Sequence, residues 1–529
     1  MASFFNLFLL SFPFAFIIRS IDSAEDKPRA FILPIRKDNV TLQYYTTVDI
    51  GTPLTYPHLV IDLGGQILWF NCENGFNSST YRPVRCGSSK CKVAKGSGCV
   101  GCNGTPRPGC TNNTCGVSPY NPFSNLLYAG GLGEDTMAIY ETDGRFYLSH
   151  IYVPRLLFAC GFNDQLQGLS NGTQGMIGLA RTQVALQTQL SSAYKIQNKF
   201  ALCLPSSSED GLGDIFIGGG PYYMPPYNKD ASTLLIKTPL IINPVSTAPI
   251  YSEGEHSDEY FINVKAIKIN EKVLSLNTSL LSIDKEGAGG TKISTITSYT
   301  TLHSAIYKAL VKEFVKKAAS KGMTRVAPVA PFGECFSAKN IRSTVTGLTV
   351  PTIVLVLEGN RKYWNIYGGN SMVRVKKNVL CLGFIDGGSN PRTSIVLGGH
   401  QLEDNLLEFD LASSTFGRKL GPNYEGGHGA AQRALLVAAG FSCFWFSFGS
   451  PLLFALGTAG SMRVGEWLLG LKMTADLTGR WWRVDSDGVM WIAASFLLML
   501  QLILCRFTVY ELCCLLVLYF CIVSVQFFD

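Results

Sequence analysis

The stretch VIDLGGQILWFNC, residues 60–72, sets one acidic residue, Asp62, between two apolar runs. Asp62 follows Val60 and Ile61 and precedes Leu63 and a Gly-Gly pair, after which ILWF resumes the apolar pattern. β-branched and aromatic residues favour strands and glycine pairs favour turns, so the pattern predicts a buried strand that delivers one carboxylate into a cleft. The chemistry of such a cleft depends on whether a second carboxylate lies opposite Asp62.

Length and composition predict a large β-rich protein. A chain of 529 residues exceeds what one hydrophobic core usually supports, so two or more domains are expected. Its 53 Gly and 24 Pro, with 32 Phe and 22 Tyr, predict many short strands joined by tight turns. The formal net charge is +7, but no block of Lys or Arg gathers it into a patch, which argues against nucleic acid as a partner.

The N-terminal residues predict export from the cell. Residues 1–24 contain an apolar run that ends in small residues, as in a cleaved secretory signal peptide, although a basic beginning is missing. Asn-x-Ser/Thr sequons, the acceptors of N-glycosylation, agree with passage through the secretory pathway. The six candidate glycosylation sites are Asn39, Asn77, Asn103, Asn112, Asn171 and Asn277.

Cysteines are dense in the same region. Eleven lie within residues 25–416, and in an exported chain this density predicts a disulfide framework whose pairing the sequence leaves open. The competing motifs are weaker: GSGCVG (96–101) lacks the following helix of a dinucleotide site, and the Cys99–Cys102 pair lacks a second pair to bind zinc. We therefore predict no metal and no cofactor. The assigned cysteines are Cys72, Cys86, Cys91, Cys99, Cys102, Cys110, Cys115, Cys160, Cys203, Cys335 and Cys381.

Short apolar or alternating runs such as HLVIDLGG, KFALCLP, DIFIGGG, TIVLVLEG and TSIVLGG favour strands throughout residues 25–416. The clearest helical window is residues 301–322, where Ile306, Leu310, Phe314 and Ala318 share one face and Gly322 is a natural terminator. A Ser-, Gly- and Pro-rich stretch at residues 206–230 indicates a junction between two lobes, which we place at residues 25–225 and 226–416.

The tail, residues 417–529, has a different character. Three apolar segments, 434–460, 489–505 and 507–528, are long enough or nearly long enough to span a bilayer as helices. Taken literally, they would anchor an extracytoplasmic protein to a membrane. The alternative is that the tail is not native coding sequence, because hydropathy does not separate an anchor from any translated apolar segment.

The stretch around Asp62 resembles the pepsin-like aspartic proteases, in which each of two β-lobes contributes a strand ending in Asp-Thr/Ser-Gly. GMIGLAR (175–181) and SIVLGGHQLEDNLLEFDLASSTFG (394–417) resemble the supporting strands of the two lobes. The resemblance implies an all-β, two-lobed pepsin-like fold with few short helices, followed here by the apolar tail. It also places Tyr128, in LLYAGG, at the position of the family's flap tyrosine.

The catalytic pair of those proteases is incomplete in this chain. Two neighbouring carboxylates share one proton, so that one activates water while the other protonates the peptide carbonyl. The resemblance puts Ser294, in GGTKISTI, where the second Asp belongs, and Leu63 and Gly65 replace the hydroxyl residues of the first loop. Asp284 is a competing second acid, but Lys285-Glu286 follows it instead of Ser/Thr-Gly. We therefore expect little or no proteolysis.

Longer stretches, including STYRPVRCGSSKC, APFGECFSAKNI and CLGFIDGGSNPRTSIVLGGHQLEDNL, resemble a plant family of extracellular dermal glycoproteins, basic globulins and inhibitors of xylanases and xyloglucan-specific endoglucanases. Its inhibitory members insert second-lobe loop residues, arginines among them, into the cleft of a glycoside hydrolase. The resemblance places Arg392 at one inhibitory position, whereas Val345 holds the other, three residues after Arg342. The family's final cysteine is absent, so one of the eleven, Cys203, is expected to lack a partner.

The leading hypothesis is thus a secreted, non-proteolytic protein of the extracellular space that inhibits a cell-wall-degrading xylanase or endoglucanase in plant defence. An active aspartic endopeptidase is the first alternative, and a binding or storage glycoprotein is the second. Membrane anchoring follows only if the tail is native.

Overall fold

The computed structural model describes residues 29–207, 213–223, 229–344 and 347–420. The predicted signal peptide (1–24) and the candidate membrane segments of the tail (434–460, 489–505 and 507–528) lie outside these residues. Within the described ranges no helix is both long enough and apolar enough to cross a membrane.

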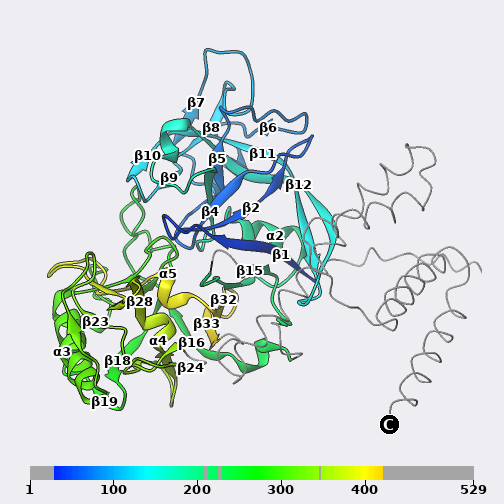
Figure 1. Ribbon diagram of the computed structural model, residues 1–529. Coiled ribbons are helices and arrows are strands. Elements are labelled where there is room, and N and C mark those ends of the chain that lie inside the picture. The colour runs from blue at the N-terminus through cyan, green and yellow to red at the C-terminus, as the bar shows by residue number, and fades with distance from the viewer. Residues whose placement is uncertain (1–28, 208–212, 224–228, 345–346, 421–529) are drawn as a thin grey trace, which may run out of the picture. The chain divides into compact units, whose positions relative to one another are not determined.

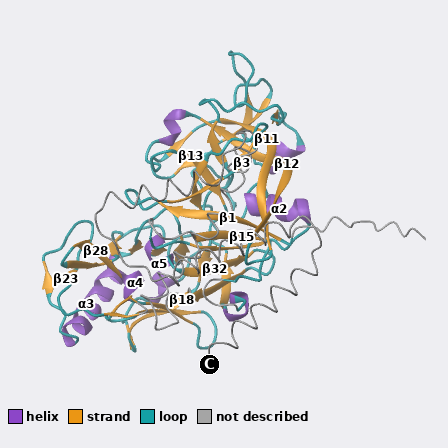
Figure 2. Cartoon of the chain, turned by 45° about the vertical axis from the view of Figure 1, so that its right-hand side comes forward, coloured by secondary structure: helices purple, strands orange, loops and turns teal. Residues whose placement is uncertain are grey.

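Strands dominate both halves of the described chain (Figures 1 and 2). The principal strands of the first half are β1 (Ala30–Lys37), β2 (Tyr44–Thr47), β4 (His58–Asp62), β5 (Trp69–Asn71), β8 (Thr114–Val117), β9 (Tyr120–Asn121), β11 (Gly130–Thr142), β12 (Tyr147–Gly161), β13 (Thr173–Gly178), β14 (Lys199–Cys203) and β15 (Gly213–Ile217). Those of the second half are β16 (Ile236–Ile241), β17 (Phe261–Ile262), β18 (Val264–Ile269), β20 (Thr291–Ile293), β21 (Thr300–Leu302), β23 (Cys335–Ser337), β24 (Ser343–Thr344), β26 (Ile353–Leu357), β27 (Tyr363–Ile366), β28 (Met372–Lys376), β29 (Val379–Leu382), β30 (Phe384–Asp386), β31 (Ile395–Leu397), β32 (Asn405–Asp410) and β33 (Thr415–Leu420).

Few helices interrupt the strands, as the sequence predicted. They are α1 (Ser89–Val93), α2 (Leu186–Tyr194), α3 (Ser304–Ser320), α4 (Gly368–Ser371) and α5 (Gly399–Leu402). The longest, α3, buries Ile306, Leu310, Phe314 and Ala318, and Gly322 adopts a left-handed φ of 75° just beyond its end. The predicted helix, its buried face and its terminator are thus confirmed, because a 3.6-residue apolar period is a strong local signal.

The two halves repeat one strand arrangement. In the first, β4 pairs in parallel with β13, while β5 pairs in parallel with β12 and antiparallel with β13. In the second, β20 pairs in parallel with β31, while β21 pairs in parallel with β30 and antiparallel with β31. This repeated motif makes β4 the counterpart of β20, and it brings the loop after each of these strands to the same place in its lobe.

A shared sheet joins the two lobes. β14 of the first lobe pairs antiparallel with β32, which continues through β33 to β16. The rings of Phe200 and Phe409 stack at 4.8 Å between centroids and Tyr260 packs against Phe409 at 4.6 Å, all three fully buried. Burial of each such ring contributes about 1.5–3 kcal/mol to stability. Because β33 runs to Leu420, the second lobe extends past the boundary that we placed at residue 416.

Ten of the eleven cysteines form five disulfides, which supports the framework prediction and supplies the pairing that the sequence left open. The pairs are Cys72–Cys160, Cys86–Cys99, Cys91–Cys115, Cys102–Cys110 and Cys335–Cys381. Cys99 and Cys102 belong to different disulfides, so the C-x-x-C spacing marks neither a redox motif nor a zinc site.

Cys203 forms no disulfide with any described cysteine, so its assignment as a disulfide cysteine is wrong. It is the one free cysteine within the described residues and lies at the end of β14, where its strand neighbours are Asp214 and Leu406. The expectation that the odd cysteine would be Cys203 is confirmed. Burial raises the pKa of its thiol well above the ordinary value, so Cys203 is held protonated.

Candidate functional site

Asp62 ends β4 in a buried turn. Its side chain is 6% exposed, and Oδ1 accepts a hydrogen bond from the Gly64 N–H at 2.7 Å. Burial raises the pKa of this carboxyl group from 3.8 to about 6; the Gly64 hydrogen bond opposes the increase, and the charge of Glu259 adds to it. Asp62 is thus a buried carboxyl group with a raised pKa.

Strand register identifies the residue that corresponds to Asp62 in the second lobe. In the first lobe Ile61 pairs with Ile177, directly before Gly178, and in the second lobe Ile293 pairs with Leu397, directly before Gly398. The residue after Ile293 is Ser294, which therefore takes the position equivalent to Asp62. It is 5% exposed, and its hydroxyl lies 3.3 Å from that of Thr297.

Thr295, the next residue, connects the two loops. Its hydroxyl donates a hydrogen bond to the Ile61 carbonyl at 2.7 Å and accepts one from the Leu63 N–H at 3.2 Å. The loop that carries Ser294 is thus fastened to the loop that carries Asp62. Leu63, the first-lobe counterpart of Thr295, has no hydroxyl and cannot form the equivalent hydrogen bonds to the second-lobe loop. The two loops are therefore joined by the Thr295 hydroxyl from one side only.

The cleft beside Asp62 has a volume of about 520 Å³ and is lined from both lobes. Its charged side chains include Glu259, whose Oε1 pairs with the Lys292 ammonium at 2.9 Å. A Cβ on Gly64 would lie 2.8 Å from the same Oε1, so a larger residue at position 64 would displace the Glu259 carboxylate from the Asp62 turn. Glu259 is therefore an acidic neighbour of Asp62 whose Oε1 is paired with Lys292.

The sequence prediction did not include Glu259, Lys292 or Tyr120. Lys292 had a detectable signal, because it lies two residues before Ser294 on a strand and shares its face. Tyr120 on β9 lines the cleft, and the Asp62 charge contributes, after burial, to a raised pKa of its phenol. The position of Glu259 depends on the pairing of β17 with β20, which a single sequence does not reveal.

Tyr128, the predicted flap residue, does not line this cleft. Its ring packs at 6.0 Å from that of Phe162, while the neighbouring Leu127 reaches the cleft wall. Tyr120, on β9, lines the cleft with Asp62, whereas Tyr128 does not. The competing acid Asp284 is exposed in a turn, where its side chain accepts a hydrogen bond from the Ala288 N–H, so it does not face Asp62.

The predicted inhibitory residues lie on second-lobe loops. Arg392 is exposed, and its Nη2 donates to the Ser246 carbonyl at 2.7 Å. Arg342 is exposed just before β24, and its carbonyl accepts a hydrogen bond from the Thr349 N–H at 2.8 Å. Both arginines are thus accessible to a partner, and the side chain of Arg392 is held by the Ser246 carbonyl.

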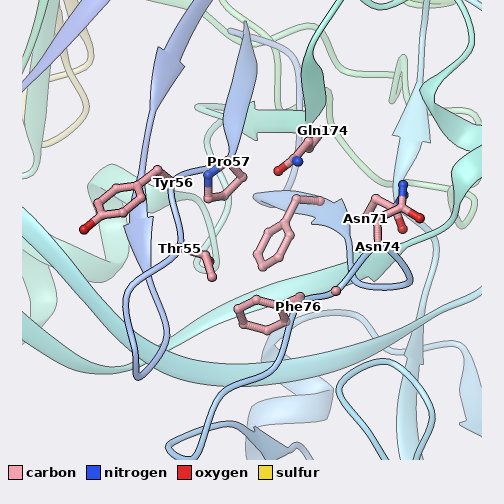
Figure 3. A pocket seen from close by; sticks show the side chains of 9 residues that line it. Thr55, Tyr56, Pro57, Asn71, Asn74, Phe76 and Gln174 are labelled. Carbon is pink, nitrogen blue, oxygen red and sulfur yellow. The ribbon is translucent and has the colours of Figure 1, made fainter.

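All six predicted glycosylation sites, Asn39, Asn77, Asn103, Asn112, Asn171 and Asn277, are exposed. A second pocket, of about 220 Å³, lies in the first lobe between β5 and β13, with the Phe76 ring on one side and the Gln174 amide on the other (Figure 3). None of the predicted site residues lines it. Within the described ranges no group of three His, Cys, Asp or Glu side chains is placed to hold a metal ion.

Comparison with known proteins decides the family. Residues 44–219 match the model described as xylanase inhibitor N-terminal, and residues 259–419 match the model described as xylanase inhibitor C-terminal. A protein named probable aspartic proteinase GIP2, from Nicotiana benthamiana, is 50% identical over 392 residues, which cover 74% of this chain and 89% of that protein. This chain belongs to the xylanase-inhibitor family.

Other members of this family extend the comparison. Gamma conglutin 1 from Prunus dulcis is 40% identical over 427 residues, covering 79% of this chain and 94% of that protein. Among solved structures, that of edgp is 50% identical, covers 75% of this chain and 96% of its own, and gives a TM-score of 0.73. Basic 7S globulin from soybean is 33% identical with the same coverage and a TM-score of 0.64. The family resemblance and the two-lobed, pepsin-like β fold are confirmed.

Proposed function

We propose that this xylanase-inhibitor family member is a secreted, non-proteolytic inhibitor of a cell-wall-degrading glycoside hydrolase and acts in plant defence. The observation that carries the proposal is Arg392, an exposed guanidinium on a second-lobe loop, held in place by the Ser246 carbonyl. Glycoside hydrolases hold two carboxyl groups in their cleft, and arginine binds a carboxylate through two parallel hydrogen bonds. Arg392 therefore has the chemistry to occupy such a cleft.

Arg342 is the second candidate contact. It is exposed, and it precedes the short β24 strand, so a partner could reach it without rearrangement of the core. Its side chain makes no hydrogen bond or ion pair with the described residues, so ordering it upon binding would cost conformational entropy that the anchored Arg392 has partly lost already. We assign the larger share of the binding energy to Arg392.

Secretion rests on two kinds of support. Five disulfides within the described residues suit an oxidising compartment, because reducing compartments keep such thiols unpaired. The six sequon asparagines are all exposed, as glycan attachment requires. We therefore place the protein in the extracellular space, and we make no membrane anchor part of the proposal.

An active endopeptidase is the alternative that Asp62 and the proteinase name of one relative suggest. Against it, serine at position 294 neither ionises readily nor shares a proton, and loss of one acid–base group typically costs 10²- to 10⁴-fold in rate. Incubation of the full chain with an acid-denatured protein substrate, with and without pepstatin, should reveal no cleavage above the Asp62→Asn variant. Pepstatin-sensitive cleavage that Asp62→Asn abolishes would favour the endopeptidase.

A binding or storage glycoprotein is the second alternative, suggested by relatives named gamma conglutin and basic 7S globulin. It shares the fold, the disulfides and the absence of a complete catalytic pair with the proposed inhibitor. Only a hydrolase target separates the two, so titration of xylanase and xyloglucan-endoglucanase activity with the purified chain is the discriminating experiment.

A further inference from the structure

Three second-lobe loops meet around Arg392. They comprise residues 243–257, residues 284–290 and residues 387–394, and more than 90 residues of chain separate the second loop from the third. The hydrogen bonds that join them close a circuit, in which each loop is bonded to the other two.

The circuit consists of three bonds between different loops. The side-chain amide of Asn243 donates to the Gly287 carbonyl at 2.9 Å, which joins the first loop to the second. The Gly289 N–H donates to the Arg392 carbonyl at 2.8 Å, which joins the second loop to the third. The Arg392 guanidinium donates to the Ser246 carbonyl at 2.7 Å, which joins the third loop back to the first.

Asn243 is the buried centre of this circuit. Its side chain is fully buried, and besides bonding to Gly287 it accepts a hydrogen bond from the Val245 N–H at 3.0 Å. Its carbonyl accepts another from the Ser257 N–H at 3.0 Å, which closes the base of the first loop. One amide thus satisfies groups on two loops, and its loss would leave buried polar groups of both unpaired.

Gly287 provides the matching surface on the second loop. It adopts a left-handed φ of 79°, and a Cβ at this position would lie 2.7 Å from Asn243 Oδ1 and 2.7 Å from Val245 Cβ. The two loops therefore approach as closely as a glycine allows, so a shift of one displaces the other.

We propose that Asn243 is the positioning residue of Arg392, and that the three loops form one preformed surface for the carboxylate-lined cleft of a glycoside hydrolase. This inference rests on the proposed function and adds the residue that holds Arg392 in position before the partner binds. The Ser246 carbonyl uses one of the five N–H donors of Arg392, and the rest can bind a carboxylate. Holding the guanidinium before the partner arrives lowers the entropy lost on binding.

The test uses full-length Asn243→Ala and Asn243→Asp, the second keeping the side-chain volume while removing the donor. Lys285→Ala is the matched control, because Lys285 is exposed on the second loop and forms an ion pair with the adjacent Glu286. Each change is made in the wild type and in Arg392→Ala, and inhibition of a sensitive hydrolase is measured together with amide hydrogen exchange of residues 284–290 and 387–394.

Both Asn243 variants should weaken inhibition by about tenfold in the wild type and add little in Arg392→Ala, because residues that act through one another are not additive. Both should also speed hydrogen exchange of the Gly289 amide. Lys285→Ala should change neither the inhibition nor the exchange rate of this amide. An equal loss of inhibition in the two backgrounds would mean a general structural role and would overturn the inference, as would unchanged exchange in both variants.

The exchange readout keeps this inference separable from the proposed function. If the wild type inhibits no hydrolase, the partner is wrong, whereas exchange still decides whether Asn243 organises the Arg392 loop. If the wild type inhibits and both Asn243 variants inhibit equally well, the function stands and the positioning role fails.

Discussion

Replacing Arg392 with alanine is expected to weaken inhibition of a sensitive glycoside hydrolase by at least about 30-fold. Truncation of a charged group that is buried against its partner costs about 2–5 kcal/mol, and each 1.4 kcal/mol is a factor of ten in affinity. In the proposed complex the loss is large because removal of the prepositioned guanidinium would leave the carboxylates of the hydrolase cleft unpaired. The inhibition constant of the purified full chain against a xylanase or endoglucanase measures the effect.

Arg374 offers a matched control for Arg392. It is likewise exposed on the second lobe, and its guanidinium donates to one backbone carbonyl, that of Lys377, at 2.9 Å. Arg374→Ala should leave the inhibition constant within about twofold of the wild type, as exposed side chains outside an interface usually do. Equal effects of the two variants would mean that inhibition depends on overall positive charge and not on the Arg392 loop.

Replacing Asp62 with asparagine is expected to stabilise the protein at neutral pH. The pKa of Asp62 is about 6 in the folded protein against an ordinary value of 3.8, so between these values the folded state binds more protons than the unfolded state. Stability is therefore lost as the pH rises through about 6. A difference of roughly 2 between the two pKa values corresponds to about 3 kcal/mol. Asparagine retains the oxygen that accepts from the Gly64 N–H while removing the buried charge.

Denaturant unfolding of the wild type and Asp62→Asn across mildly acidic to neutral pH measures this effect. The variant should be more stable by about 2–3 kcal/mol at pH 7, and the difference should vanish below about pH 4, where Asp62 is protonated in both states. Asp143→Asn is the control, because Asp143 is exposed and hydrogen bonds, first that from the Phe146 N–H, lower its pKa. A destabilised Asp62→Asn at pH 7 would contradict the account of a carboxyl group whose ionisation is disfavoured by burial.

The sequence alone predicted features that depend on neighbouring residues. The apolar period of residues 301–322 defined helix α3 and its four buried side chains, and the quoted stretch around Asp62 defined a buried strand and turn. Ser294 was located by resemblance, and the strand register places it at the position equivalent to Asp62. For the helix and for the strand a local pattern sufficed, because the helix and strand periods appear in neighbouring residues.

Features that depend on long-range packing escaped prediction. Tyr128 was assigned as the flap tyrosine by resemblance, and only the path of the chain after β9 brings Tyr120 into the cleft lining instead. Glu259 reaches the Asp62 turn through the close approach over Gly64, and the Arg392–Ser246 bond joins residues 146 positions apart. The cysteine pairs likewise required the fold, since eleven cysteines allow many connectivities.

The most direct test of the central claim is titration of glycoside hydrolase activity with the purified full chain, using a panel of fungal xylanases and xyloglucan endoglucanases. The account predicts that the activity of at least one enzyme falls in proportion to added protein and reaches its minimum near a one-to-one ratio, as tight binding requires. Undiminished activity of every enzyme in the panel at about tenfold molar excess and micromolar concentration would contradict it.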